Sequence, residues 1–313
     1  MIQKKGRPVL RIFLVFFTGI LLWGSCRTLP HWEFTQFPLL LPSDGQLYLY
    51  LPVSTHRSLI DKVLPSNPPQ GMLYFLNRTR ELYGVLLSEK DGKDASWIFL
   101  ALGEYSSFLV RSALSEDQGW KREEFSHQGY RIPYFQHQNL GVQIALLEGN
   151  LLLVSNGAIP TVLKRYVSPS ITLAPPPLSA WIERSDLIEL FLSSQGLKEI
   201  VSSIPLFQSP VGDIPGIRLL RLVLEPKDGK ELYVARGVLS FDQEAQARSM
   251  GIILRLLVGT WILGQEIKQG QFTPKIIAEG TYIQISDLPI PSQTLVEVLK
   301  PMVDRWIERN SLW

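Results

Sequence analysis

One cysteine and four histidines are the scarcest side chains of this 313-residue sequence that could do chemistry. They are Cys26, His31, His56, His127 and His137. The histidines do not form HExxH or another spacing that puts two metal ligands on one helix face. The sequence also lacks the P-loop, G-x-S-x-G and G-x-G-x-x-G motifs. It therefore predicts no metal site, no cofactor and no catalytic residue.

The position of Cys26 offers a reason for a single cysteine. Residues 1–11 carry four basic side chains, residues 12–24 are 13 apolar or small residues without a charge, and Ser25 precedes the cysteine. A basic start followed by about 7–15 apolar residues is typical of a signal peptide. A membrane-spanning helix needs roughly 20 apolar residues. The pattern therefore predicts export across a membrane.

This segment resembles the precursor of a bacterial lipoprotein, in which a small residue precedes the cysteine and a leucine lies shortly upstream. Gly24 and Ser25 are small, and Leu22 lies four positions before Cys26. Trp23 stands where the strict pattern has leucine, so the segment is similar to the relaxed, spirochaete-type version. The resemblance implies cleavage between Ser25 and Cys26 and lipid, such as diacylglycerol and palmitate, on the cysteine sulfur. Two or three acyl chains would anchor the protein durably.

Two other interpretations of the N-terminus stay open. An uncleaved signal anchor that begins at Val9 and tolerates Arg11 would have 18 residues before Arg27. An ordinary cleaved signal peptide would leave Cys26 without a role. We expect the lipid anchor, because the sole cysteine of the chain lies where the lipid would be attached. The expected location is the bacterial cell envelope, with the body in the periplasm or at the cell surface.

The composition is typical of a folded protein whose body carries almost no net charge. Hydrophobic residues make up 45% and charged residues 19% of the chain, which is long enough for two domains. The net charge is +2, and four basic side chains lie in the first eleven residues. A neutral body gives no electrostatic reason to expect nucleic acid as a partner.

Two blocks of the body recur in the same order. LLSEKDGK at 86–93 matches VLEPKDGK at 223–230, and GNLLLVSNGAIPT at 149–161 matches GTYIQISDLPIPS at 280–292. The two offsets, 137 and 131 residues, are nearly equal. We therefore expect an internal duplication. The expected domains are a signal peptide (1–25), a lipidated tether (26–43), an α+β unit (44–167), a Pro-rich linker (168–180) and a second α+β unit (181–313).

Each unit is expected to hold a mainly antiparallel sheet with helices packed on one face, which is the α+β class. The KDGK sequences predict hairpin turns, because Asp-Gly supplies the positive φ values of a tight turn. Residues 46–52 and 178–184 are expected to be opening strands, and Ser185 is expected to cap the helix after the second. Further helices are expected over 104–114, over 242–263 and after each Ile-Pro pair.

The apolar stretch at 250–263 is the sharpest feature of the body. It is too short for a membrane span and contains Arg255. Its apolar residues surround the helix, which indicates either a buried helix or one that is apolar on two sides. We expect a central core helix. The alternative is a helix that lines a hydrophobic cavity or forms a docking surface for a protein or lipid.

These features predict a membrane-anchored envelope lipoprotein that acts as a non-enzymatic binding or structural module for an envelope protein or glycan. The alternative is a carrier or sensor of an apolar ligand, such as lipid, in a pocket lined by helix 242–263. An enzyme with a dispersed site also stays open, because one sequence cannot reveal such a site. The body loosely resembles duplicated, uncharacterised periplasmic α+β proteins, which implies a fold rather than an activity.

Overall fold

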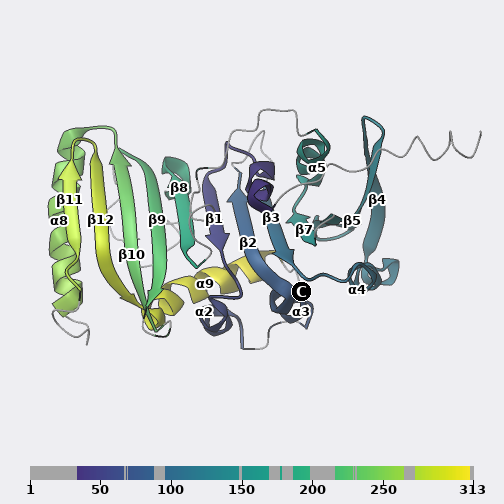
Figure 1. The fold of residues 1–313 in the computed structure, drawn as a ribbon, viewed down its shortest axis with the longest axis horizontal. Helices are drawn as coiled ribbons and strands as arrows, with labels where there is room; N and C mark the ends of the chain where they lie inside the picture. The colour runs from purple at the N-terminus through teal and green to yellow at the C-terminus, as the bar shows by residue number, and fades with distance from the viewer. Residues whose placement is uncertain are drawn as a thin grey trace, which may run out of the picture.

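The computed structural model describes residues 34–66, 68, 70–87, 96–147, 150–168, 177, 186–197, 216–227, 229, 231–263 and 272–310. The predicted signal peptide, Ser25, Cys26, His31, the first KDGK turn and most of the predicted linker lie outside these residues. The described residues form an α+β body around one antiparallel sheet of 12 strands (Figure 1). The α+β class and the mainly antiparallel sheet are therefore confirmed.

The strands correspond to the β-rich runs of the sequence. In the first half they are β1 Leu47–Leu51, β2 Thr79–Leu86, β3 Trp97–Gly103, β4 Trp120–His127, β5 Tyr130–His137, β6 Gln143–Leu147 and β7 Leu151–Ser155. In the second half they are β8 Ile188–Ser193, β9 Ile217–Lys227, β10 Leu232–Phe241, β11 Lys275–Glu279 and β12 Tyr282–Pro291.

The helices connect these strands and cover the sheet. They are the short 3-10 helices η1 Phe34–Leu40 and η2 Glu116–Gln118, and the α-helices α2 Arg57–Val63, α3 Gln70–Arg78, α4 Ser107–Ala113, α5 Ile159–Val167, α8 Glu244–Leu263 and α9 Ser292–Asn310. Expected helices at 104–114, at 242–263 and after both Ile-Pro pairs are thus present, as α4, α8, α5 and α9.

The two halves of the chain share one strand order. From the centre outward the first half runs β1-β2-β3-β7-β6, and the second runs β8-β9-β10-β12-β11. In the first half the hairpin β5-β4 extends the sheet further. The halves meet where β1 pairs with β8, with four registered residue pairs from Leu47↔Leu192 to Tyr50↔Glu189. The two units are therefore parts of one sheet rather than two separate sheets. That they arose by duplication stays a prediction.

Helices pack on both faces of the sheet, not on one face as expected. Along β1, Tyr48 and Tyr50 belong to a core cluster with η1 and α5, whereas Leu49 and Leu51 pack into a cluster with α2 and α9. Alternate residues of a strand point to opposite faces. Strands that are apolar at nearly every position, such as WIFLALG in β3, are suited to burial on both sides.

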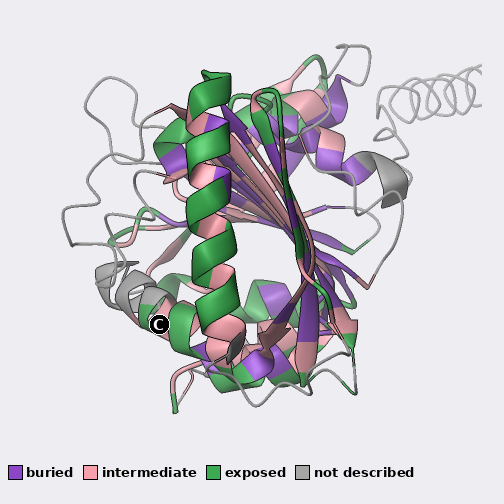
Figure 2. Cartoon of the chain, turned by 90° about the vertical axis from the view of Figure 1, so that its left-hand side faces the viewer, coloured by how far each residue is buried: buried purple, intermediate pink, exposed green. Residues whose placement is uncertain are grey.

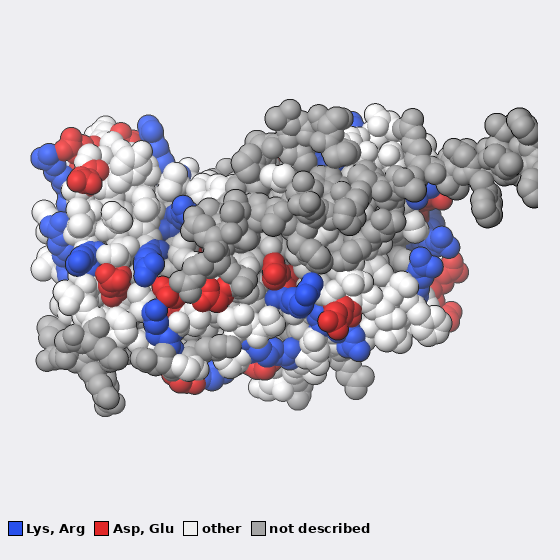
Figure 3. Space-filling model, viewed as in Figure 1, with Lys and Arg blue, Asp and Glu red and all other residues white. Residues whose placement is uncertain are grey.

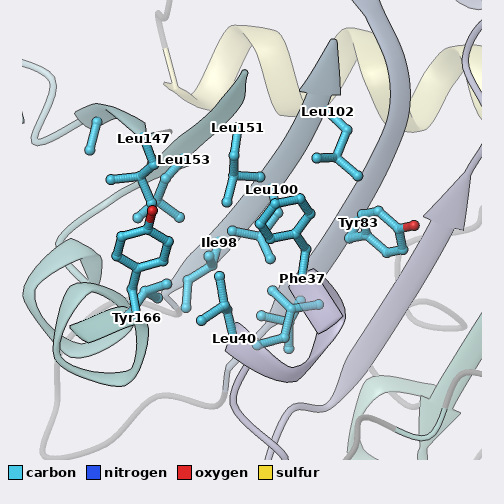
Figure 4. Close-up of a cluster of buried hydrophobic side chains, with 14 of the residues drawn as sticks. Phe37, Leu40, Tyr83, Ile98, Leu100, Leu102, Leu147, Leu151, Leu153 and Tyr166 are labelled. Carbon is cyan, nitrogen blue, oxygen red and sulfur yellow. The ribbon is translucent and has the colours of Figure 1, made fainter. Parts of the chain in front are cut away.

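The largest core cluster includes residues of η1, which begins eight residues after the predicted anchor at Cys26. Phe37 and Leu40 of η1 are buried against β3, whose Ile98, Leu100 and Leu102 point toward them (Figure 4). The guanidinium of Arg165 donates to the carbonyl of Leu41 at 2.7 Å, which fixes the end of this segment. The residues from Phe34 onward therefore belong to the folded body, although 26–43 was expected to be a tether.

The helix that was expected after Ser185, at the start of the second unit, is wrong for residues 188–193, which the structure describes. The segment Ile188–Ser193 is the strand β8, so Asp186-Leu187-Ile188 does not begin a helix after Ser185. Four of the six residues of this strand are apolar, and β8 pairs with β1 and β9 on its two sides. Ser185 and the expected strand 178–184 lie outside the described residues.

Alanine substitutions at two glycines are expected to change the free energy of unfolding in opposite directions. A Cβ on Gly103, at the end of β3, would overlap the backbone carbonyl of Arg78. Overpacking of this kind costs about 1–3 kcal/mol, so we expect Gly103→Ala to lower the free energy of unfolding by that amount. Gly259 in α8 has open space at its Cβ position. Gly259→Ala should raise the free energy of unfolding by about 0.5–1 kcal/mol. Urea unfolding of both variants checks the pair, and a destabilised Gly259→Ala would contradict it.

Candidate functional site

The three histidines within the described residues lie apart. His127 and His137 are at opposite ends of the β4–β5 hairpin, where they pack against Phe125 and Trp120 with ring centroids 6.1 and 5.0 Å apart. His56 is buried at the junction of the two halves. Among the residues that the structure describes, no group of three or more His, Cys, Asp or Glu side chains could hold a metal ion.

Helix α8 lies along β11, β12 and β10 at one end of the sheet (Figure 1). It contacts the sheet through one stripe whose members are spaced three or four residues apart. The stripe contains Ala247, Met250, Leu254 and Val258, and it packs against Ile276 and Ile283. Gly251 allows a close approach, because a Cβ there would lie 3.1 Å from the Cβ of Ala278.

The opposite side of α8 is apolar and exposed. The exposed fractions are 57% for Ile252, 47% for Ile253, 66% for Leu256 and 58% for Leu257. Spacings of one, four and five residues place these side chains together on one side of a helix, and Figure 2 shows an exposed outer side along α8. We call these four residues the outward α8 face. The expected central core helix is therefore wrong, because α8 is apolar on two sides and only one of them packs on the sheet.

After Glu244, the first residue of α8, both charged residues of the helix are basic. Glu244 begins the helix and pairs with Arg248, and the only later charge is Arg255. Arg255 donates to the backbone carbonyl of Ile276 on the edge strand β11 at 2.9 Å. Arg248 and Arg255 thus lie on the same helix as the outward α8 face, Arg248 in an ion pair with Glu244 and Arg255 on the sheet. Within the described part of the chain, no helix is both long and apolar enough to cross a membrane.

Other exposed apolar residues form smaller groups. Phe108 and Leu109, exposed by 76% and 41%, lie on α4, the helix that follows the corresponding hairpin in the first half. Elsewhere on the described face shown in Figure 3, acidic and basic side chains are interspersed. This arrangement gives no extended field of one sign to attract a polyanion. The outward α8 face is therefore the candidate functional site.

The helical periodicity of the sequence contained a signal for this face, which the apolar composition of residues 250–263 alone did not reveal. Residues 247, 250, 254 and 258 follow the helical repeat of one stripe, and residues 252, 253, 256 and 257 follow a second one. The two stripes can be separated from the sequence. Which of them faces the solvent could not be read from it, because that depends on the position of α8 at the end of the sheet.

The fold is similar to three solved crystal forms of the protein TP0453. Crystal form I matches with a TM-score of 0.57 and 16% identity over 84% of this chain and 96% of that chain. Form III has a TM-score of 0.58 and 16% identity over 84% and 97% of the two chains. Form IV has a TM-score of 0.58 and 15% identity over 89% and 98%. At these identities the likeness establishes the fold alone. No curated protein sequence matches the chain.

A match to a sequence family shows which family the chain belongs to, which the likeness of the fold alone cannot show. Residues 35–192, just over half of the chain, match the family described as "Outer membrane-associated lipoprotein TP0453". This description agrees with the predicted spirochaete-type lipoprotein and with a lipid-anchored protein of the cell envelope. The chain therefore belongs to the TP0453 family of outer membrane-associated lipoproteins.

Proposed function

We propose that the protein is a non-enzymatic envelope lipoprotein that is anchored through lipid on Cys26 and docks its body on a lipid surface through the outward α8 face. The observation that carries this proposal is the group of four adjacent aliphatic side chains that are 47–66% exposed. Membership of an outer membrane-associated family supports a membrane rather than a soluble protein as the occupant.

The chemistry of α8 suits the interface of a bilayer. A helix that lies in this interface buries its apolar side about 5–10 Å deep and keeps basic side chains at the headgroups. The outward α8 face supplies the apolar side, and Arg248 lies on the same helix near its first turn. Fully burying an exposed Leu or Ile contributes about 1.5–3 kcal/mol. Four half-exposed side chains would contribute roughly half of that each, which gives a weak but useful docking energy.

The lipid anchor would make this weak docking effective. A body held to a membrane by its own lipid meets that membrane at an effective concentration of the order of millimolar. Affinity that is marginal for a free protein is then enough to keep the body on the surface. The anchor would decide which membrane is bound, and the outward α8 face would decide how the body lies on it.

A second candidate is a carrier of an apolar ligand between α8 and the sheet. One observation favours it: Met250, Leu254 and Val258 of the inner stripe are only partly buried. Native mass spectrometry of the mature chain with Cys26→Ala checks this candidate. A bound lipid that copurifies would support it, and a consistently ligand-free species would end it.

Acidic substitution of the outward α8 face tests the docking proposal. We expect Leu256→Glu with Leu257→Glu to weaken binding of the mature Cys26→Ala chain to phosphatidylcholine–phosphatidylglycerol vesicles by about 10-fold to 100-fold. Stability should change by no more than about 0.5 kcal/mol per site, because both side chains are exposed. Vesicle flotation and urea unfolding give the two measurements.

The matched control is Val298→Glu on α9, an exposed apolar residue outside the outward α8 face. It should leave vesicle binding unchanged. Equal binding by the wild type and the α8 variant, or equal losses in the α8 variant and the control, would exclude this face as the docking site.

A further inference from the structure

Arg255 is the only charged residue of the apolar stretch 250–263. It is exposed on α8, and its Nε donates to the backbone carbonyl of Ile276 on β11 at 2.9 Å. Within the part of the chain that the structure describes, Arg255 makes no other hydrogen bond and no ion pair. Its guanidinium is therefore fixed at one nitrogen, whereas the two Nη nitrogens keep their N–H donors.

The carbonyl that holds Arg255 lies on the free edge of the sheet. β11 is a terminal strand and pairs only with β12. The carbonyl of Thr281 accepts from Phe241 on β10, so the backbone of the next residue, Tyr282, points to β11, where it pairs with Glu279. Because the direction alternates along a strand, the carbonyl of Ile276 points away from β12. The bond from Nε thus places the guanidinium beside the sheet, not inside the core.

Arg255 also lies at the boundary between the two apolar sides of α8. Gly251, four residues earlier, and Val258, three residues later, belong to the side that packs on the sheet. Ile252, three residues earlier, belongs to the outward α8 face. Residues three or four apart are neighbours on the surface of a helix. The side chain of Arg255 therefore leaves the helix on its flank, next to the outward α8 face.

This flank would meet lipid headgroups if the outward α8 face lay in a bilayer. An interfacial helix buries its apolar side about 5–10 Å deep, so that its flanks lie among the headgroups. A guanidinium binds a phosphate group through parallel N–H···O bonds and is only weakly hydrated. Arg248, the other arginine of α8, is already paired with Glu244. Arg255 is thus the arginine of this helix whose guanidinium is not paired with a carboxylate.

We propose that Arg255 binds the phosphodiester of a phospholipid headgroup when the outward α8 face docks on a bilayer. The bond to Ile276 orients the guanidinium, and the Nη nitrogens donate to the phosphate oxygens. This inference rests on the proposed docking function. It adds a preference for lipids that carry a phosphate over lipids whose headgroup is a sugar.

The test compares two kinds of vesicle without net charge. One consists of phosphatidylcholine, and the other of digalactosyldiacylglycerol, which contains no phosphate. In flotation, the mature Cys26→Ala chain should bind phosphatidylcholine about 5-fold more tightly than the galactolipid. Arg255→Met in the same chain should bind both kinds of vesicle equally, at the level at which the unsubstituted chain binds the galactolipid.

Two control variants separate this inference from the docking proposal. Arg248→Met should keep the preference for phosphatidylcholine, because the Arg248 guanidinium is paired with Glu244. Leu256→Glu with Leu257→Glu should lose binding to both kinds of vesicle. If that variant binds both as well as the chain without it, the docking proposal fails, and this inference fails with it. If docking holds but Arg255→Met keeps the preference, only the phosphate site is overturned.

Two further measurements exclude other roles of Arg255. If Arg255→Met also weakens binding to the galactolipid, Arg255 acts by holding α8 on the sheet, and the phosphate site is overturned. Glycerophosphocholine, the same headgroup without acyl chains, should not remove the preference when it is added at the concentration of the lipid. Loss of the preference with intact galactolipid binding would assign a free phosphate ester as the ligand and overturn the lipid headgroup.

Discussion

Replacing Cys26 with alanine is expected to abolish incorporation of an alkyne-tagged fatty acid and to move the protein from the membrane to the soluble fraction. Cys26 is the only cysteine, so no other thiol can replace it. Each buried methylene of an acyl chain contributes about 0.8 kcal/mol, so the methylenes of two or three chains together contribute more than the outward α8 face can provide. In-gel fluorescence of the labelled protein and membrane fractionation measure the two effects.

The control for this substitution is Ser25→Ala, which keeps a small residue before the cysteine. It should leave labelling and fractionation unchanged, because the resemblance to lipoprotein precursors requires only a small side chain there. Mass spectrometry of the mature wild-type chain gives a second test. A chain that retains Met1 and has an unmodified Cys26 sulfur would contradict both the predicted cleavage and the lipid anchor.

Substitution of Arg221 by methionine is expected to give the largest loss of stability. The Nε of Arg221 on β9 donates to Glu189 on β8 at 2.6 Å, and the Glu189 side chain is 0% exposed, against 39% for Arg221. Removing one partner of a buried ion pair takes away much of the compensation of the other charge, here the carboxylate of Glu189. We expect Arg221→Met to lower the free energy of unfolding by about 3 kcal/mol, measured by urea unfolding.

Two further variants separate the lost ion pair from lost packing. Adding Glu189→Leu to Arg221→Met should restore most of the stability, because no buried charge then remains. Arg218→Met removes an ion pair with Asp242 in which both side chains are at least half exposed, and it should cost at most about 1 kcal/mol. If Arg221→Met costs no more than Arg218→Met, the buried carboxylate does not depend on Arg221.

The parts of the fold that could be predicted are those set by local sequence. The second KDGK sequence marks the turn between β9 and β10, because Asp-Gly favours a tight turn whatever surrounds it. The Ile-Pro pairs mark the start of α5 and α9: Pro160 lies in the first turn of α5, where a proline is tolerated, and Pro291 ends β12 directly before α9. The apolar periodicity also located α4 and α8 within a few residues.

The incorrect predictions concern contacts between distant parts of the chain. The segment Ile188–Ser193 is a strand because it pairs with β1, more than a hundred residues earlier, and short apolar runs can form either helix or strand. The strand β4 was missed because its sequence WKREEFSH is highly charged, and it is held by eight registered pairs with β5. Packing of helices on both faces likewise depends on contacts between distant parts of the chain, because α2 and α9 share one core cluster.

For the candidate sites too, local sequence could predict some features, whereas others depend on contacts between distant parts of the chain. Residues 250–263 could be singled out from the sequence, but the exposed side of α8 is set by the end of the sheet on which it packs. His56 could be noted only as an isolated histidine. Its partner Tyr233 is 177 positions away, and no local pattern links the two residues.

The burial of η1 has a consequence for where the protein can work. Because the chain is fixed in the body from Phe34 onward, only residues 27–33 separate the folded part from a lipid on Cys26. Even fully extended, these residues span roughly 28 Å between Cys26 and Phe34. A lipidated chain would thus keep its body within a thin layer next to its own leaflet, too close to reach across a wide compartment. Any molecule that it serves must come to that layer.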